Sequence, residues 1–265
     1  MNIKEIQEKS LLKKITRKDT LFHGDFTLDP YQNCAFGCPY CDSSFDPIIY
    51  IKQNALSLLK EEMKDKKNKR IIIGSVHDPY QPIEQTMKLT RNILSFLLSN
   101  QQPIHILTKS SRILQDLDIL TQFNDMLVTI SIPFIDTTHA SIFEPNVENP
   151  LHRMSLVSKL KKNHIKTGIA AIPIIPYISD SDETLNTLFK TAKTNSASYL
   201  LCKPLFLKGD QKYKMFELIK NEFPKVFPRF KKEYSTTIEP SNTYQINLKN
   251  KIQTIATLYQ ILLQI

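Results

Sequence analysis

The chain has 265 residues, 41% of them hydrophobic and 23% charged, which is typical of a soluble globular protein with a sizeable core. Its four cysteines, three of them in one short segment, do not form a disulfide framework and favour a reducing, cytoplasmic setting. No apolar signal core follows Met1 and no apolar run approaches the ~18 residues of a membrane span, whereas a formal net charge of +9 allows a polyanionic partner such as nucleic acid.

Predicted strands and helices alternate along most of the chain. Residues 1–22 form a polar lead-in that we expect to be partly helical through Ile6, Leu11 and Leu12. Short aliphatic runs of the kind found in buried parallel strands predict strands at 25–28, 70–74, 104–108, 126–132, 167–172 and 198–202. Apolar residues at helical spacing predict helices near 53–66, 83–97, 110–117, 149–160, 185–192, 212–222 and 252–262.

This alternation predicts parallel β/α units, with chemistry at the carboxyl ends of the strands. Within 126–132, Val128 and Ile130 alternate with Thr129 and Ser131. In a barrel, that pattern directs the aliphatic side chains to the outer helices and the hydroxyls to the interior. We divide the chain into a lead-in (1–22), a core domain (23–235) and a C-terminal helical extension (236–265).

Between the first predicted strand and the first predicted helix lies Asp29-Pro-Tyr-Gln-Asn-Cys-Ala-Phe-Gly-Cys-Pro-Tyr-Cys-Asp42, which holds Cys34, Cys38 and Cys41. Thiolates at such short spacing are ligands for soft metal centres. A structural zinc site usually takes four ligands, and the fourth cysteine, Cys202, is far away in the sequence. Three ligands with one open position suit a 4Fe–4S cluster better, although zinc stays an alternative.

The pattern Cys34-x-x-x-Cys38-x-x-Cys41, with Tyr40 before the last cysteine, resembles the cluster loop of radical S-adenosylmethionine (SAM) enzymes. The resemblance implies a partial (β/α)6 TIM-type barrel of α/β class with a C-terminal helical extension. It also implies one 4Fe–4S cluster, SAM as a second cofactor, and an electron donor such as a flavodoxin or ferredoxin. Further segments resemble the branch similar to spore photoproduct lyase, also described as DNA repair photolyase-like. They are Asp78-Pro-Tyr-Gln-Pro82, Leu107-Thr-Lys-Ser110, Glu144-Pro145 and Ala171-Ile-Pro-Ile-Ile-Pro176.

The family resemblance also implies roles for individual residues. The three cysteines would ligate the cluster, and Tyr40 would lie near the adenine of SAM, with simple packing as the alternative. Gly74 and Ser75 would contact the SAM amino group through the backbone, and His77 would bond SAM, move a proton or cap a turn. Lys109 would pair with the SAM carboxylate, since an ammonium there offsets its charge. Ser131 would also contact SAM.

One feature of the branch is missing from this chain. Spore photoproduct lyase returns a hydrogen atom from a cysteine at the end of the second strand, where this chain has Gly74-Ser75-Val76. Cys202 is the only spare thiol and the only candidate catalytic hydrogen donor, although a buried apolar cysteine is the commoner explanation of such a residue.

We therefore expect a radical SAM enzyme that acts on an unidentified substrate, with nucleic acid as one candidate. The rival is a non-catalytic iron–sulfur or zinc protein that binds nucleic acid through its basic surface. We also expect Glu144 and Arg153 to form an ion pair that shapes the loop after the fourth strand.

Overall fold

The computed structural model describes residues 2–41, 47–64 and 66–265. Asp42, the last residue of the cysteine-rich stretch, and Asp65, in the predicted first helix, lie outside the described residues. In the described part of the chain, a seven-stranded sheet has the order β10-β9-β8-β7-β6-β3-β2. Its six parallel strands are β3 (Phe26–Leu28), β6 (Ile71–Ile73), β7 (Ile104–Thr108), β8 (Met126–Ser131), β9 (Lys166–Ile174) and β10 (Leu200–Pro204).

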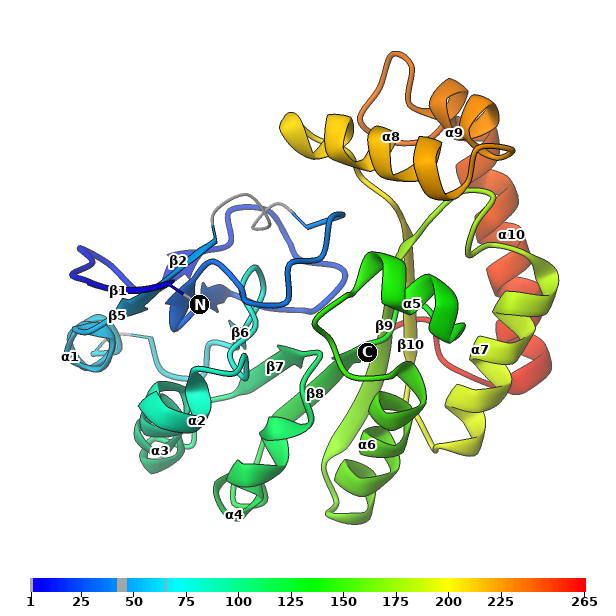
Figure 1. Cartoon of the computed structure of the whole chain (residues 1–265). Coiled ribbons are helices and arrows are strands. Elements are labelled where there is room, and N and C mark those ends of the chain that lie inside the picture. The colour runs from blue at the N-terminus through cyan, green and yellow to red at the C-terminus, as the bar shows by residue number, and fades with distance from the viewer. Residues whose placement is uncertain (1, 42–46, 65) are drawn as a thin grey trace.

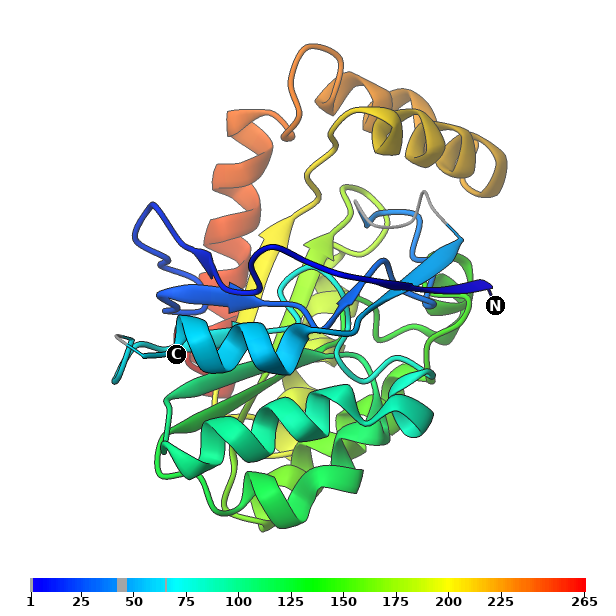
Figure 2. The same ribbon diagram turned by 90° about the vertical axis from the view of Figure 1, so that its left-hand side faces the viewer.

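These six strands match the predicted ones and form an open barrel, with β2 (Lys13–Lys14) antiparallel at one edge. Helices lie along the outside of the sheet (Figures 1 and 2). They are α1 (Ala55–Glu62), α2 (Glu84–Met87), α3 (Leu89–Ser99), the 3-10 helix η1 (Ser111–Asp116), α4 (Leu117–Leu120), α6 (Pro150–Lys162) and α7 (Asp182–Thr194). Helix α5 (Thr137–Phe143) lies instead at the carboxyl ends of the strands (Figure 1), where Phe143 belongs to the same hydrophobic cluster as Phe36 of the cysteine loop. The fold is thus the expected α/β partial barrel.

The end of the chain completes the helical layer. Helices α8 (Asp210–Glu222) and α9 (Phe227–Glu233) lie above the barrel, and α10 (Asn242–Tyr259) runs alongside β10 (Figure 2). Leu248, Ile252 and Ile255 of α10 belong to the same hydrophobic core as the barrel strands. The predicted C-terminal helix is therefore present, and it packs on the barrel.

The first residues of the chain differ from the prediction. Instead of a partly helical lead-in, they form β1 (Asn2–Ile6), which pairs in parallel with β5 (Ile48–Lys52), and then β2. Strand β4 (Tyr31–Gln32) completes this small sheet. Leu11 and Leu12 are buried in the main core, and the Glu62 carboxylate accepts hydrogen bonds from both of their backbone N–H groups.

Local sequence explains several boundaries. Asn149 caps α6 by accepting from Leu151 N–H, and Pro150 occupies the first turn, as predicted. Ser110 caps η1 in the same way. The single helix expected over 83–97 is divided into α2 and α3, because Lys88 takes a left-handed backbone conformation (φ 51°) between them. No helix in the described part of the chain combines the length and apolarity that crossing a bilayer requires.

Candidate functional site

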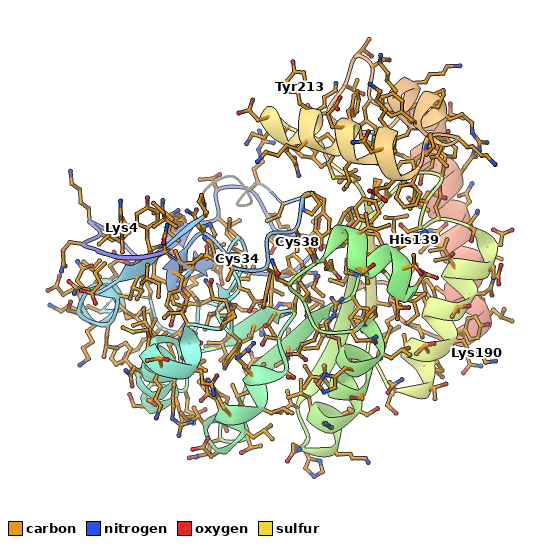
Figure 3. The ribbon with its side chains drawn as sticks, in the orientation of Figure 1. Lys4, Cys34, Cys38, His139, Lys190 and Tyr213 are labelled. Atoms are coloured by element: carbon orange, nitrogen blue, oxygen red, sulfur yellow. The ribbon has the colours of Figure 1, made fainter. Side chains whose placement is uncertain are left out.

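A cavity of about 420 Å³ opens at the carboxyl ends of the parallel strands. That volume lies within the range of small-molecule binding sites. The cavity brings together eight of the ten predicted site residues: Cys34, Cys38, Tyr40, Cys41, Gly74, Ser75, Lys109 and Ser131. Figure 3 places Cys34 and Cys38 in the middle of the molecule below α8.

The cysteine loop leaves β4 and folds back on itself. Asn33 has a left-handed backbone (φ 66°), and its side-chain amide donates to Ile48 O at 2.8 Å. Within the loop, Cys41 N–H donates to Cys38 O at 2.9 Å. Burial raises the pKa of the Cys34 and Cys38 thiols to about 12, so they need a neighbouring cation to become thiolates. No group of three or more His, Cys, Asp or Glu among the described residues is arranged to hold a single metal ion.

Lys109 projects from the end of β7 into the cavity. Its ammonium donates to Ser131 Oγ at 2.6 Å, lies 3.7 Å from Glu144 Oε1, and stands 5.8 Å from the centre of the Tyr40 ring. Glu144 also accepts from the Tyr40 hydroxyl and pairs with Arg153, and both members of that ion pair are fully buried. Two cations thus share the Glu144 carboxylate, and because Arg153 pairs with it more closely, the Lys109 ammonium can pair with an anionic group that enters the cavity.

The predicted pair of Glu144 and Arg153 is therefore present. Arg153 also donates to Ser131 O at 2.6 Å and to Glu148 O at 3.0 Å. A buried guanidinium with all these acceptors fixes the loop after β8 against the end of that strand.

Gly74 ends β6 in a conformation that only glycine adopts easily. Its φ is +85°, and a Cβ there would lie 2.4 Å from Pro79 Cδ and 2.5 Å from Leu107 O. Its backbone N–H donates to Leu28 O at 3.1 Å, inside the sheet. The strand end can therefore approach β7 closely, and this brings Ser75 to the cavity wall.

His77 and Cys202 do not line the cavity in this structure. The His77 backbone N–H donates to Asp29 at 3.1 Å, and burial lowers the pKa of its imidazole. Cys202 packs against the main core, and its register partner on β9 is Ala171, whereas the neighbouring Ala170 and Ile172 line the cavity. The thiol therefore faces the helical layer, as a buried apolar cysteine would, and a role for Cys202 as hydrogen donor stays a prediction. A contact between His77 and SAM stays a prediction.

A hydrogen-bonded chain fills the barrel below the cavity. His105 Nδ1 lies 3.0 Å from Phe22 O, His105 Nε2 lies 2.7 Å from Thr129 Oγ1, and Thr129 Oγ1 lies 2.7 Å from the Tyr199 hydroxyl. Because Phe22 O only accepts, Nδ1 carries the proton, Thr129 donates to Nε2, and Tyr199 donates to Thr129. Burial lowers the pKa of His105 to about 4, in agreement with this neutral form.

Sequence reasoning missed several lining residues. Leu21 and Phe22 come from the lead-in, and Gln211 comes from α8, where its amide donates to Tyr40 O. No local pattern marks a contact between residues 171 positions apart in the chain. The exposed Phe206, on the connection from β10 to α8, also borders the cavity.

A family model described as the radical SAM superfamily matches residues 28–188, more than half of the chain. The chain therefore belongs to the radical SAM superfamily.

Two relatives match the chain over more than half of its length. An uncharacterized protein of Mycobacterium tuberculosis is 22% identical over 275 residues, covering 97% of this chain and 81% of the relative. An uncharacterized protein of Methanocaldococcus jannaschii is 32% identical over 162 residues, covering 58% of this chain and 62% of the relative.

Among solved structures, spore photoproduct lyase complexed with dinucleoside spore photoproduct has a TM-score of 0.73 and 15% identity, covering 97% of this chain and 79% of the lyase. SuiB of Streptococcus suis, bound to its precursor peptide SuiA, has a TM-score of 0.59 and 13% identity, covering 90% of this chain and 47% of SuiB. At these identities the similarity is one of fold, and it confirms the expected resemblance to the spore photoproduct lyase branch at that level.

Membership of the superfamily implies a 4Fe–4S cluster and SAM as cofactors, and the residues at the cavity fit both. Three thiols border one cavity, and thiolate is the usual ligand of iron–sulfur clusters. The Lys109 ammonium, on the same cavity, suits the carboxylate of SAM.

Proposed function

We propose that this protein is an enzyme that reductively cleaves SAM at a 4Fe–4S cluster held by Cys34, Cys38 and Cys41. The cofactors supply the chemistry: one electron gives methionine and a 5′-deoxyadenosyl radical, which takes a hydrogen atom from the substrate. The observation that supports this role is that three thiols and the Lys109 ammonium border the same cavity. A non-catalytic metal protein would not need that second, anion-binding half of the site.

The remaining residues of the cavity bind and orient SAM in this proposal. Lys109 and Ser131 hold the carboxylate, and the backbone at Gly74 and Ser75 receives the amino group. Tyr40 lies near the adenine, with its hydroxyl held by Glu144. Ala170 and Ile172 form an apolar wall on β9 that excludes water from the reacting groups.

For the substrate, nucleic acid is the candidate that the charge distribution supports. Residues 203–232, which follow the cavity wall on β10, contain nine Lys and Arg but three Asp and Glu. The exposed Phe206 at the cavity offers a ring on which a base can stack. Binding of a labelled single-stranded DNA should weaken steeply as salt rises. No measurable binding at low salt would exclude this substrate class. The electron donor is proposed to be a flavodoxin or ferredoxin.

The experiment that tests the enzymatic role is anaerobic reconstitution with iron and sulfide, followed by measurement of 5′-deoxyadenosine formed from SAM and a reductant. We expect Cys38→Ala to lose both the brown chromophore and SAM cleavage. Cys202→Ala is the matched control, because that thiol faces the helical layer, and it should keep both. Full retention of iron and sulfide in Cys38→Ala would contradict the proposed ligand set.

A further inference from the structure

The segment from Asp78 to Gln81 lies between the two halves of the cavity. It follows β6, and its sequence, Asp78-Pro-Tyr-Gln81, belongs to one of the stretches that resemble the spore photoproduct lyase branch. Its first residue contacts the end of β7, and its last residue contacts the cysteine loop. The contacts at each end are made by fully or almost fully buried side chains.

Gln81 holds the backbone on both sides of Cys34. Its side-chain oxygen accepts from Ala35 N–H at 3.0 Å, and its side-chain nitrogen donates to Asn33 O at 3.1 Å. One buried carboxamide therefore satisfies the two backbone groups that flank a cluster ligand. Such a double contact fixes the direction in which the Cys34 side chain leaves the loop.

Asp78 connects Cys34 to the lysine side of the cavity. Its backbone N–H lies beside the Cys34 thiol. Its carboxylate accepts from Thr108 Oγ1 at 2.7 Å and from Lys109 N–H at 2.7 Å. A single residue thus lies beside a proposed cluster ligand and accepts a hydrogen bond from the backbone of the proposed SAM-binding lysine.

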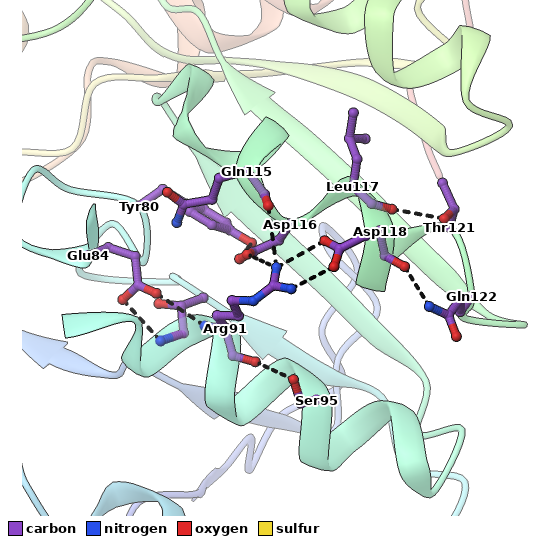
Figure 4. Close-up of polar contacts among 11 residues, drawn as sticks. Tyr80, Glu84, Arg91, Ser95, Gln115, Asp116, Leu117, Asp118, Thr121 and Gln122 are labelled. Carbon is purple, nitrogen blue, oxygen red and sulfur yellow. Dashed lines mark hydrogen bonds and ion pairs between the residues drawn. The ribbon is translucent and has the colours of Figure 1, made fainter. Parts of the chain in front are cut away.

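Hydrogen bonds and an ion pair outside the cavity hold the segment in place, and Figure 4 shows those of Tyr80, Glu84 and Arg91. The Tyr80 hydroxyl donates to Asp116 at 3.0 Å, and Arg91 pairs with the same carboxylate at 2.8 Å. Glu84 accepts from the Thr90 and Arg91 backbone N–H groups and from the hydroxyl of Tyr31 on β4, just before the cysteine loop. The anchoring residues are not part of the cavity, so their role is to hold the segment in place.

We propose that the Asp78–Gln81 segment is a positioning element that fixes the Cys34 sulfur relative to Lys109, and that Gln81 thereby sets the reduction potential of the cluster. This inference rests on the proposed function, since it takes Cys34 as a cluster ligand. Hydrogen bonds to cluster sulfurs stabilise the more negative, reduced state and raise the potential. If Gln81 no longer holds the backbone on both sides of Cys34, the Cys34 sulfur moves away from the Asp78 N–H, whose dipole favours the more negative state, and the potential falls.

The test is a redox titration of the reconstituted protein, which gives the reduction potential of the cluster. The electron paramagnetic resonance signal of the reduced cluster is then recorded with and without SAM. Gln81→Met keeps most of the side-chain volume and removes both hydrogen bonds, and Gln81→Ala removes the volume as well. Gln102→Met is the matched control, because Gln102 is equally buried and bonds to Lys66 O and Lys69 O just before β7 begins, at the opposite end of the strands from the cavity.

We expect both Gln81 variants to have a more negative reduction potential than the wild type and an altered signal on addition of SAM, with the control unchanged. Loss of iron from the Gln81 variants alone, with unchanged secondary structure by circular dichroism, would also support the positioning role. A wild-type potential and signal in Gln81→Met would refute it, as would equal damage in Gln102→Met. If the wild type bound no cluster, the proposed function would fail first.

Discussion

Lys109 shows how one side chain can be ready for a ligand before the ligand arrives. Its ammonium is held by Ser131 and stands near Glu144, but the Glu144 carboxylate is already paired with Arg153. The charge on Lys109 is therefore only partly compensated by the protein. A carboxylate that enters the cavity would complete the pairing without creating a new buried charge.

Replacing this lysine should weaken binding of SAM while leaving the cluster in place. A hydrogen bond to a charged group contributes about 1.5–3 kcal/mol, so Lys109→Ala should raise the dissociation constant of SAM about ten- to a hundredfold. Iron and sulfide analysis should match the wild type, and calorimetry or equilibrium dialysis would measure the affinity. An unchanged dissociation constant would mean that Lys109 does not hold SAM.

His105 predicts a pH dependence of stability. Its pKa is about 4 in the folded protein, because burial disfavours the charged ring, and about 6.5 in an unfolded chain. Between these values the unfolded chain binds a proton that the folded chain does not bind. The contribution is therefore complete above pH 6.5 and is lost as the pH falls toward 4, by about 2 kcal/mol between pH 7 and pH 5.

Denaturant unfolding at pH 7 and pH 5 would measure this effect. His105→Gln should show a smaller decrease in the free energy of unfolding between the two pH values than the wild type. His152, whose side chain is about half exposed, provides the control variant His152→Gln, which should behave like the wild type. Identical pH profiles for all three proteins would show that His105 titrates normally.

At the scale of elements, the sequence predicted what depends on neighbouring residues. The run Ile104–Thr108 and the cap at Asn149 and Pro150 have local signals, and both occur as predicted. The strand Asn2–Ile6 has no such signal, because four of its five side chains are exposed and its partner β5 lies some 46 residues away. The contact of Gln211 with Tyr40 was unpredictable for the same reason.

The cavity itself was predictable because the carboxyl ends of parallel strands meet at one edge of a barrel. That rule places the ends of β6, β7 and β8 together, and Gly74, Lys109 and Ser131 follow from it. The rule does not predict whether a side chain points into the barrel or toward the outer helices when every residue of a strand is apolar. Cys202 is such a case. Leu200, Leu201 and Cys202 are all apolar, so no polar residue shows which of them faces the inside of the barrel.

The connection between α5 and α6 depends on one buried ion pair. Arg153 and Glu144 are both fully buried, and Arg153 also binds two backbone carbonyls. Arg153→Met would leave those acceptors unpaired, and breaking a buried pair costs about 3–5 kcal/mol of stability. Unfolding by denaturant should show this loss, while Lys251→Met, which removes a solvent-exposed pair with Asp182, should cost less than about 1 kcal/mol. Similar losses in the two variants would contradict a structural role for Arg153.

At the scale of the whole molecule, the cavity at the end of the open barrel is enclosed by parts of the chain that lie far apart in the sequence. A second hydrophobic cluster joins Phe36 and Tyr40 of the cysteine loop to Phe143 of α5 and to Met215 of α8. The lead-in contributes Leu21 and Phe22 to the cavity wall. The cavity is therefore assembled only when these distant parts of the chain pack on the barrel.

The residues that line the cavity determine whether the protein can use the thiol-dependent route of spore photoproduct lyase. That route requires a hydrogen donor in contact with the product radical, because atom transfer becomes very slow when donor and radical separate. The end of β6 offers Gly74, Ser75 and Val76, none of which has a weak S–H bond. Cys202, the remaining thiol outside the proposed cluster ligands, faces the helical layer with its register partner Ala171.

We therefore expect 5′-deoxyadenosine to form from SAM without repair of spore photoproduct DNA, and Cys202→Ala to form it at the wild-type rate. Chromatography of digested DNA after anaerobic incubation would quantify the thymines released, and the same samples would give the 5′-deoxyadenosine. Efficient conversion to thymines by the wild type would overturn the prediction. Loss of that conversion in Cys202→Ala would then identify the donor, and it would require β10 to turn Cys202 from the helical layer toward the cavity.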